Sequence, residues 1–217
     1  MKRLKYKHFH ADIIFLNLRW YLAYPLSYRN LEEMMNDRGI NIHHTSIYRW
    51  VQEYSPKLVK NFNKRKLPVS KSWRMDETYI KVRGKWRYLY RAVDKHGKTV
   101  DFMLSSKRDV SAAASFLCRA MGNNCVPDKI NIDKSGANTA GIYLYNEIES
   151  TNIENRRCKY LKNIVEGDHF GLKRTLTSVT GFKRMKSARN SIYGTEVILM
   201  IHQRSARTIW IGAPISA

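Results

Sequence analysis

Long apolar runs, paired cysteines and acidic side chains are all scarce in this chain of 217 residues. The apolar stretch near the N-terminus is interrupted by Asp12, Asn17 and Arg19, so the sequence predicts neither a membrane span nor a signal peptide. Three cysteines with no Cys-x-x-Cys pair favour reduced thiols over a disulfide or zinc framework. These absences predict a cytoplasmic protein that does not use a membrane as its partner.

The shortage of acids leaves a strongly basic chain. Lys and Arg number 39 against 18 Asp and Glu, which gives a formal net charge of +21 and a pI of about 10.0. Hydrophobic residues make up 43%, so the chain is able to bury a core and is not globally disordered. This balance predicts a polyanionic partner, with nucleic acid favoured over an anionic membrane surface.

The N-terminal part shows the apolar spacing of three short helices. They are predicted within residues 9–23, after an N-cap at Ser27, and from about Thr45 to Tyr54. The side chains expected to face inward are Ala11, Ile14, Phe15, Leu18, Leu22, Tyr28, Leu31, Met35, Ile47, Trp50, Val51 and Tyr54.

The second and third of these segments form a helix-turn-helix pattern, with Gly39 in the turn. The outward side of the third helix carries His43, His44, Ser46 and Arg49. Because the chain is basic, we expect these residues to contact DNA. A plain three-helix bundle with a solvated polar face is the alternative.

From residue 73 the apolar period changes to that of strands. Strands are predicted at Trp73–Val82, Trp86–Val93, Lys98–Leu104, Lys129–Ile132 and Asn152–Arg156. Helices are predicted at Val110–Met121, Asn138–Ser150, Val165–Leu176 and Met185–His202. This mixed α/β order is typical of ribonuclease H-like folds, in which helices flank a mixed sheet. The fold class is therefore α/β, preceded by a small all-α helix-turn-helix domain.

Three carboxylates stand out in this second part of the chain. Asp76 lies within the first predicted strand, Asp133 ends the fourth, and Glu166 opens a predicted helix. The first and fourth strands are commonly neighbours in a sheet of this order, so the acids are expected to meet in one cleft. Carboxylate oxygens suit Mg²⁺, and two such ions can hold the attacking and leaving oxygens of a phosphodiester displacement.

Neighbouring residues refine this candidate site. Glu77 is expected to point to the opposite face of the sheet from the first acid. Asp168 is the alternative to Glu166 as the third ligand. Lys173 lies two helical turns after Glu166 on the same face, where it and Arg174 are expected to contact DNA phosphate. Taken singly, each acid also fits an ordinary strand, turn or helix-start position.

Several motifs around these acids follow one another in a recognisable order. They are Trp73–Val82, Gly84–Asp94, Ile132–Lys134, Tyr160–His169, Leu172–Arg174 and Gly181–Lys183, together with Tyr28–Met35 and Ser46–Val51. The Met-Asp-Glu-Thr-Tyr run at residues 75–79 is a specific signal. In these motifs the chain resembles bacterial insertion-sequence transposases of the "IS six" family.

The resemblance implies a ribonuclease H-like DDE domain behind a helix-turn-helix, with Asp76, Asp133, Glu166 and Lys173 as catalytic residues. It implies DNA cleavage and strand transfer with two Mg²⁺ ions, for which Mn²⁺ can substitute. The implied partners are double-stranded DNA, as terminal inverted repeats and target, and further copies of the chain in a homodimer or larger oligomer.

The corresponding domain boundaries place a helix-turn-helix DNA-binding region at residues 1–58 and a basic linker at 59–72. The DDE catalytic domain follows at 73–202, and residues 203–217 form an atypical tail. We expect the protein to act in the bacterial cytoplasm, at the nucleoid.

Two features depart from the family pattern. Between Asp133 and Glu166 lie 32 residues, slightly fewer than the family leads us to expect, and the tail lacks the usual basic ending. A catalytically decayed copy that only binds DNA is therefore the alternative function. A ribonuclease of similar fold is disfavoured by the helix-turn-helix, because the major groove of A-form RNA is closed to helices.

Overall fold

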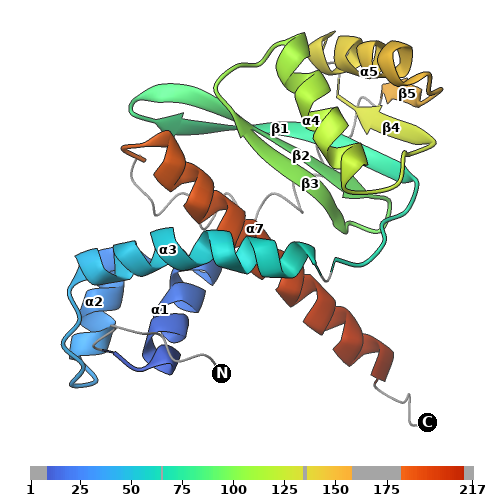
Figure 1. Cartoon of the computed structure of the whole chain (residues 1–217). Helices are drawn as coiled ribbons and strands as arrows, with labels where there is room; N and C mark the ends of the chain where they lie inside the picture. The colour runs from blue at the N-terminus through green and yellow to red at the C-terminus, as the bar shows by residue number, and fades with distance from the viewer. Residues whose placement is uncertain (1–8, 65, 134–135, 158–181, 213–217) are drawn as a thin grey trace. The chain divides into compact units, whose positions relative to one another are not determined.

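A computed structural model describes residues 9–64, 66–133, 136–157 and 182–212, with side chains in the last helix up to residue 202. The chain forms two compact units: Lys66–Phe170, and a second that joins Met1–Arg65 to Gly171–Ala217. Figure 1 follows the chain through both. No helix among the described residues is long and apolar enough to cross a membrane.

A five-stranded sheet is the framework of the Lys66–Phe170 unit. Its strands are β1 (Ser72–Val82), β2 (Lys85–Asp94), β3 (Thr99–Ser105), β4 (Lys129–Ile132) and β5 (Glu154–Arg157). They lie in the order β3-β2-β1-β4-β5. The first three strands pair antiparallel, whereas β4 runs parallel to β1 and to β5. This sheet is ribonuclease H-like, and each strand begins and ends within two residues of its predicted limits.

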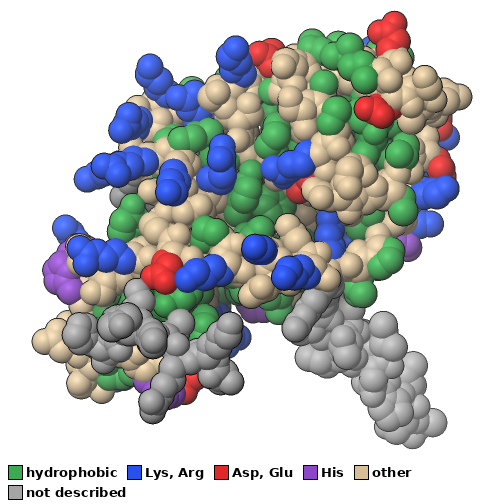
Figure 2. Space-filling view, in the orientation of Figure 1, with side chains coloured by type: hydrophobic (Ala, Val, Ile, Leu, Met, Phe, Trp, Pro, Cys, Tyr) green, Lys and Arg blue, Asp and Glu red, His purple; other side chains and the backbone are tan. Residues whose placement is uncertain are grey.

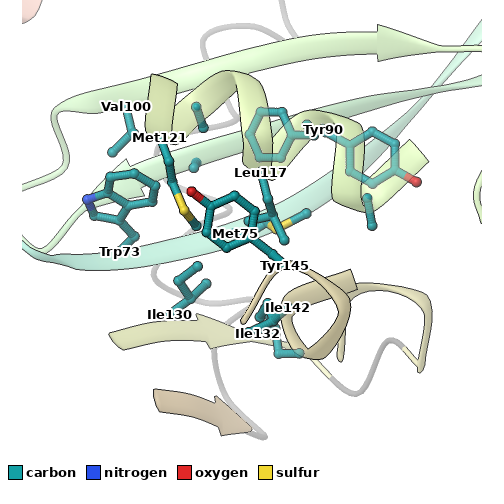
Figure 3. Close-up of a cluster of buried hydrophobic side chains, with 14 of the residues drawn as sticks. Trp73, Met75, Tyr90, Val100, Leu117, Met121, Ile130, Ile132, Ile142 and Tyr145 are labelled. Atoms are coloured by element: carbon teal, nitrogen blue, oxygen red, sulfur yellow. The ribbon is translucent and has the colours of Figure 1, made fainter. Parts of the chain in front are cut away.

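Helices α4 (Val110–Gly122) and α5 (Gly136–Glu149) pack on one face of this sheet (Figure 1). Alternate strand residues supply the core beneath them: Trp73 and Met75 of β1 and Ile130 and Ile132 of β4 are at most 1% exposed. Figure 3 shows them packed with Tyr90, Val100, Leu117, Met121, Ile142 and Tyr145. This core holds β1 and β4 in a single register.

Local sequence explains where α4 begins and how closely α5 packs against it. The Asp109 carboxylate accepts a hydrogen bond from the Ala112 N–H at 2.8 Å, which caps the helix. At Gly141 the two helices approach so closely that an added Cβ would lie 2.8 Å from the Cβ of Ala113. Only glycine permits this approach without moving α4.

The other unit contains α1 (Ala11–Ala23), α2 (Tyr28–Asn36), α3 (His44–Asn63) and α7 (Met185–Gly212). Ser27 caps α2 as predicted: its hydroxyl accepts from the Asn30 N–H, and the Asn30 side chain accepts from the Ser27 N–H. Gly39 adopts a φ of +72° in the turn before α3. The predicted inward residues that are buried are Ile14, Leu18, Leu22, Leu31, Met35, Ile47, Trp50, Val51 and Tyr54.

Several details of this unit differ from the prediction. Phe15 is 44% exposed, because α1 turns a stripe that includes Asn17 and Tyr21 inward instead. α7 is longer than predicted, and it packs against α1 and α3. α3 continues to Asn63, so the first residues of the predicted linker are helical. The helix predicted at residues 165–176 lies outside the described residues.

α3 continues through Pro56 because α7 provides a hydrogen bond that the proline cannot. Proline has no N–H, so the carbonyl of Gln52, four residues earlier, loses its helical donor. Asn190 of α7 donates from Nδ2 to this carbonyl at 3.2 Å and to the Gln52 side chain at 3.1 Å. Helices usually end before a proline, but here the hydrogen bond from Asn190 allows α3 to continue.

Asn190→Ala is expected to lower the free energy of unfolding by about 1 kcal/mol, because the half-buried Gln52 carbonyl loses its donor. Pro56→Ala restores an N–H within the helix, so Asn190→Ala should cost less in that background. Chemical denaturation of all four proteins measures this coupling. Equal costs in both backgrounds would show that the contact does not support α3.

Candidate active site

Asp76 and Asp133 lie side by side where β1 and β4 run parallel. Trp73 pairs with Ile130 and Met75 pairs with Ile132. The next residue along each chain is a carboxylate: Asp76 within β1 and Asp133 directly after β4. Both are half-buried. Since the residues before them point into the core beneath α4 and α5, the alternation of side chains directs Asp76 to the opposite face.

Glu77 lies on the α4 side of the sheet, as the alternation predicts. Its cross-strand partner Tyr90 belongs to the core under α4. The Glu77 side chain is 3% exposed, and its carboxylate forms an ion pair with Arg108, which precedes α4. Burial raises the pKa of Tyr90, and the carboxylates of Glu77 and Asp109 raise it further, so the phenol stays neutral.

A buried arginine that the sequence analysis did not single out lies opposite Asp76. Arg91 of β2 is the cross-strand partner of Asp76 and is 2% exposed. Directly opposed residues share a face, so its guanidinium lies on the same side of the sheet as the first carboxylate. Its Nη2 donates to the hydroxyl of Thr99, itself 4% exposed, at 3.1 Å. The sequence could have pointed to Arg91, because it is the one charged residue in the apolar run Leu89–Val93. An arginine in such a strand is expected to be buried and to need hydrogen-bond partners.

The other residues predicted for this site, Glu166, Asp168, Lys173 and Arg174, lie outside the described residues. The structure therefore brings together two of the three predicted acids. These two come from distant parts of the chain and become neighbours only through the pairing of β1 with β4. The roles of all the predicted site residues stay predictions.

The predicted DNA-contacting residues lie in the first turns of α3. Arg49 is exposed, whereas Ser46 and His44 are half-buried. Ile47 is fully buried, so the outward side of the helix is the one predicted. His44 Nδ1 lies 2.8 Å from Glu32 Oε2, which links the start of α3 to α2.

Glu32, His43 and His44 form a group of three metal-ligating side chains whose ligand atoms lie within 4.8 Å of one another; it is the one such group among the described residues. His43 Nδ1 lies 2.8 Å from the Thr45 hydroxyl at the start of α3. Desolvation opposes the charge on Glu32, but the hydrogen bond from His44 and the charge of His43 lower the pKa of its carboxyl. The group serves as a polar link between α2 and α3.

Comparison with known proteins identifies the family. A family model described as a DDE domain matches residues 70–205. The chain is 36% identical over 214 residues to the transposase for insertion sequence-like element IS431mec of Staphylococcus aureus strain N315, covering 97% of this chain and 93% of that protein. The chain belongs to the "IS six" family of DDE transposases. The transposase for insertion sequence element IS257 in transposon Tn4003 of the same species matches with the same identity and coverage.

Among solved structures, the transposase is similar to the catalytic core domain of BIV integrase. That match has a TM-score of 0.46 and 17% identity, and it covers 65% of this chain and 99% of the other. The catalytic core domain of HTLV-2 integrase in complex with magnesium matches with a TM-score of 0.42 and 15% identity, covering 58% and 85%. The fold of the transposase follows from its own strand order and pairing.

A DDE transposase uses divalent metal ions, and the described residues fit such an ion. Asp76 and Asp133 offer carboxylate oxygens, the ligands that hard divalent cations prefer, from equivalent positions of adjacent strands. β1 is paired with β2 along almost its whole length and with β4 as far as Met75, so the backbone that leads into Asp76 is held firmly. The sheet therefore brings two carboxylates to one place.

Thr99→Val is expected to destabilise the transposase by about 1.5–3 kcal/mol, because it removes the acceptor of a buried charged donor, Arg91. Thr99→Ser keeps the hydroxyl and should cost much less. Urea unfolding of the two variants and the parent provides the comparison. If Thr99→Ser costs more than Thr99→Val, packing of the threonine methyl and not the hydrogen bond stabilises this position.

Proposed function

We propose that this transposase binds the ends of its insertion sequence, cuts them and joins the freed ends to target DNA. The observation that carries the proposal is the juxtaposition of Asp76 and Asp133 by the parallel pairing of β1 and β4. Membership of the DDE family supports Glu166 as the third acid. Catalysis is assigned to residues 73–202 and end binding to residues 1–58.

The proposed site holds two Mg²⁺ ions, for which Mn²⁺ substitutes, on Asp76, Asp133 and Glu166. Bound there, the metal supplies an activated water and charge stabilisation for an in-line phosphodiester displacement. The contribution of the protein is to hold the three carboxylates in one place and the DNA in line with them. Lys173 and Arg174 are proposed to contact the phosphates beside the cut without reading sequence.

The proposed DNA contacts of the N-terminal unit come from His44, Ser46 and Arg49 at the start of α3. Their helix presents one polar side while the opposite side is buried. A formal net charge of +21 supports binding to double-stranded DNA, both the terminal repeats and the target. Cutting two ends and joining them to one target favours a homodimer or larger oligomer assembled on DNA in the nucleoid.

Asp76→Asn, Asp133→Asn and Glu166→Gln are each expected to reduce strand cleavage by on the order of 10³-fold or more, because several kcal/mol of charge stabilisation is lost with a metal ligand. Binding to end DNA should persist. Purified protein, Mg²⁺ and a labelled element end provide the assay. Asp128→Asn is the matched control, since Asp128 is an exposed acid just before the other end of β4.

Different outcomes separate the alternatives. Full activity of Glu166→Gln with loss in Asp168→Asn would move the third ligand to Asp168. An unsubstituted protein that binds ends but does not cleave them would identify a decayed, DNA-binding copy. The short stretch of 32 residues between Asp133 and Glu166 is the feature that favours this second candidate. Normal cleavage by Asp76→Asn would remove the basis of the proposal.

Arg49→Ala is expected to weaken binding to element ends by about 1–3 kcal/mol while changing binding to unrelated DNA much less, because a base contact carries specificity. Lys60→Ala, which removes an exposed charge near the other end of α3, is the control. Titrations of both variants with end and scrambled duplexes at fixed salt make the comparison. If Arg49→Ala loses the same affinity for both duplexes, Arg49 contacts phosphate and does not read the sequence.

A further inference from the structure

The outer end of the β1–β2 hairpin exposes a row of aromatic side chains on one face. Tyr79 pairs with Tyr88 and Lys81 pairs with Trp86, so all four side chains share that face. Tyr79 is 49% exposed and Trp86 is 55% exposed, although both lie in regular strands. The Tyr79 ring centroid lies 5.4 Å from that of Tyr88 and 6.3 Å from that of Trp86, with edges meeting faces. We call Tyr79, Lys81, Trp86 and Tyr88 the aromatic ladder.

The exposure of the ladder is not a requirement of the fold. The other face of the same hairpin carries Ile80 and Val82, which are 7% and 3% exposed. The side chains on that face already give the hairpin buried apolar surface, so its stability does not require the rings of the ladder. Tyr88 also packs against the core beneath α4, which anchors the inner end of the ladder. Two large aromatic rings exposed to solvent on a well-anchored hairpin indicate a ligand-binding surface.

Cations hold the exposed rings in place. Lys81 Nζ lies 5.2 Å from the centroid of the Trp86 ring, and Arg108 Cζ lies 5.6 Å from that of Tyr79. Arg108 is itself fixed by its ion pair with the buried carboxylate of Glu77. Partial burial works against the charge of Arg108, but the Glu77 carboxylate raises its pKa. The guanidinium therefore stays charged beside the ring.

The charge of the hairpin selects the class of ligand. Between residues 79 and 88 there are four basic side chains and no acidic one: Lys81 shares the face of the ladder, Arg83 lies in the turn, and Lys85 and Arg87 belong to the other face. Figure 2 shows Lys and Arg side chains gathered over this end of the hairpin, at the upper left of the view. A polyanion is attracted to such a surface, and rings beside cations add a means to hold flat, aromatic groups.

We propose that the aromatic ladder binds unpaired bases of DNA, which stack on Trp86 and Tyr79 while Lys81 on the same face and Arg83 in the turn contact the adjoining phosphates. Unpaired bases fit better than a duplex because the base faces of a duplex are already covered by their neighbours. Tyr79 follows Asp76 by three residues in β1, roughly 10 Å along the strand, and its side chain lies on the other face of the sheet from that of Asp76. If the proposed cleavage site is correct, the source of such bases is DNA opened next to the cut.

The test measures binding without cleavage. Fluorescence anisotropy follows full-length transposase binding, in EDTA, to a labelled oligothymidine of roughly 15 nucleotides and to a duplex of equal length. Trp86→Ala and Tyr79→Ala are each expected to weaken binding of the single strand by roughly 5- to 150-fold and to leave duplex binding unchanged. Trp86→Phe keeps a ring and should retain most of the affinity. Tyr143→Ala is the matched control, since Tyr143 is 60% exposed on α5, away from the hairpin.

Stacking has its own signature. A 2-aminopurine within the oligonucleotide should lose fluorescence on binding the parent and Trp86→Phe, but not on binding Trp86→Ala. Unchanged single-strand affinity in Trp86→Ala and Tyr79→Ala would overturn the proposal, as would an equal loss on single strand and duplex. A loss of self-association with unchanged DNA binding would also overturn it and make the ladder an interface between copies. The binding assay is done in EDTA, so it does not depend on cleavage. A protein that fails to cleave DNA can still pass this test, and a protein that fails this test can still cleave DNA.

Discussion

The parallel register between β1 and β4 is the constraint on which the proposed chemistry depends. Trp73 and Met75 on one strand, and Ile130 and Ile132 on the other, are buried beneath α4 and α5. A slip of one residue would turn these side chains away from the core, at a cost that no local contact could offset. The same register that buries them puts Asp76 beside Asp133. Core packing on one face of the sheet thus positions two carboxylates of the proposed metal site.

Buried charges on this sheet are all held by specific partners. The Asp94 carboxylate accepts hydrogen bonds from the backbone N–H groups of Ser70, His96 and Lys98, which closes the turn between β2 and β3. Arg91 donates to Thr99 at the start of β3. Because a buried charge without partners is costly, these bonds restrict the strands to one arrangement around Asp76. Rigidity of this kind suits an enzyme whose main task is to orient a displacement.

Much of the fold was predictable because its signals are local and periodic. All five strands and the described helices were predicted from alternation, apolar spacing and capping residues, and Glu77 was placed on the correct face by the same alternation. Phe15 was wrongly predicted to face inward, because in a short helix the apolar spacing does not fix the centre of the buried side to within one residue. The end of α3 was missed because proline is a reliable local stop signal, and the donor that replaces its N–H comes from α7.

By itself, the sequence determined the order of elements, the strong positive charge and which carboxylates lay in or directly after strands, because these are properties of neighbouring residues. It also carried the family motifs, whose order along the chain is a fact of sequence alone. Only the tertiary structure decided that Arg91 lies across from Asp76, that Glu77 holds Arg108 beside Tyr79, and that Tyr79 and Trp86 face outward. Each of these depends on which strand pairs with which and on what covers each face. Such contacts join residues far apart in sequence, and no local pattern records them.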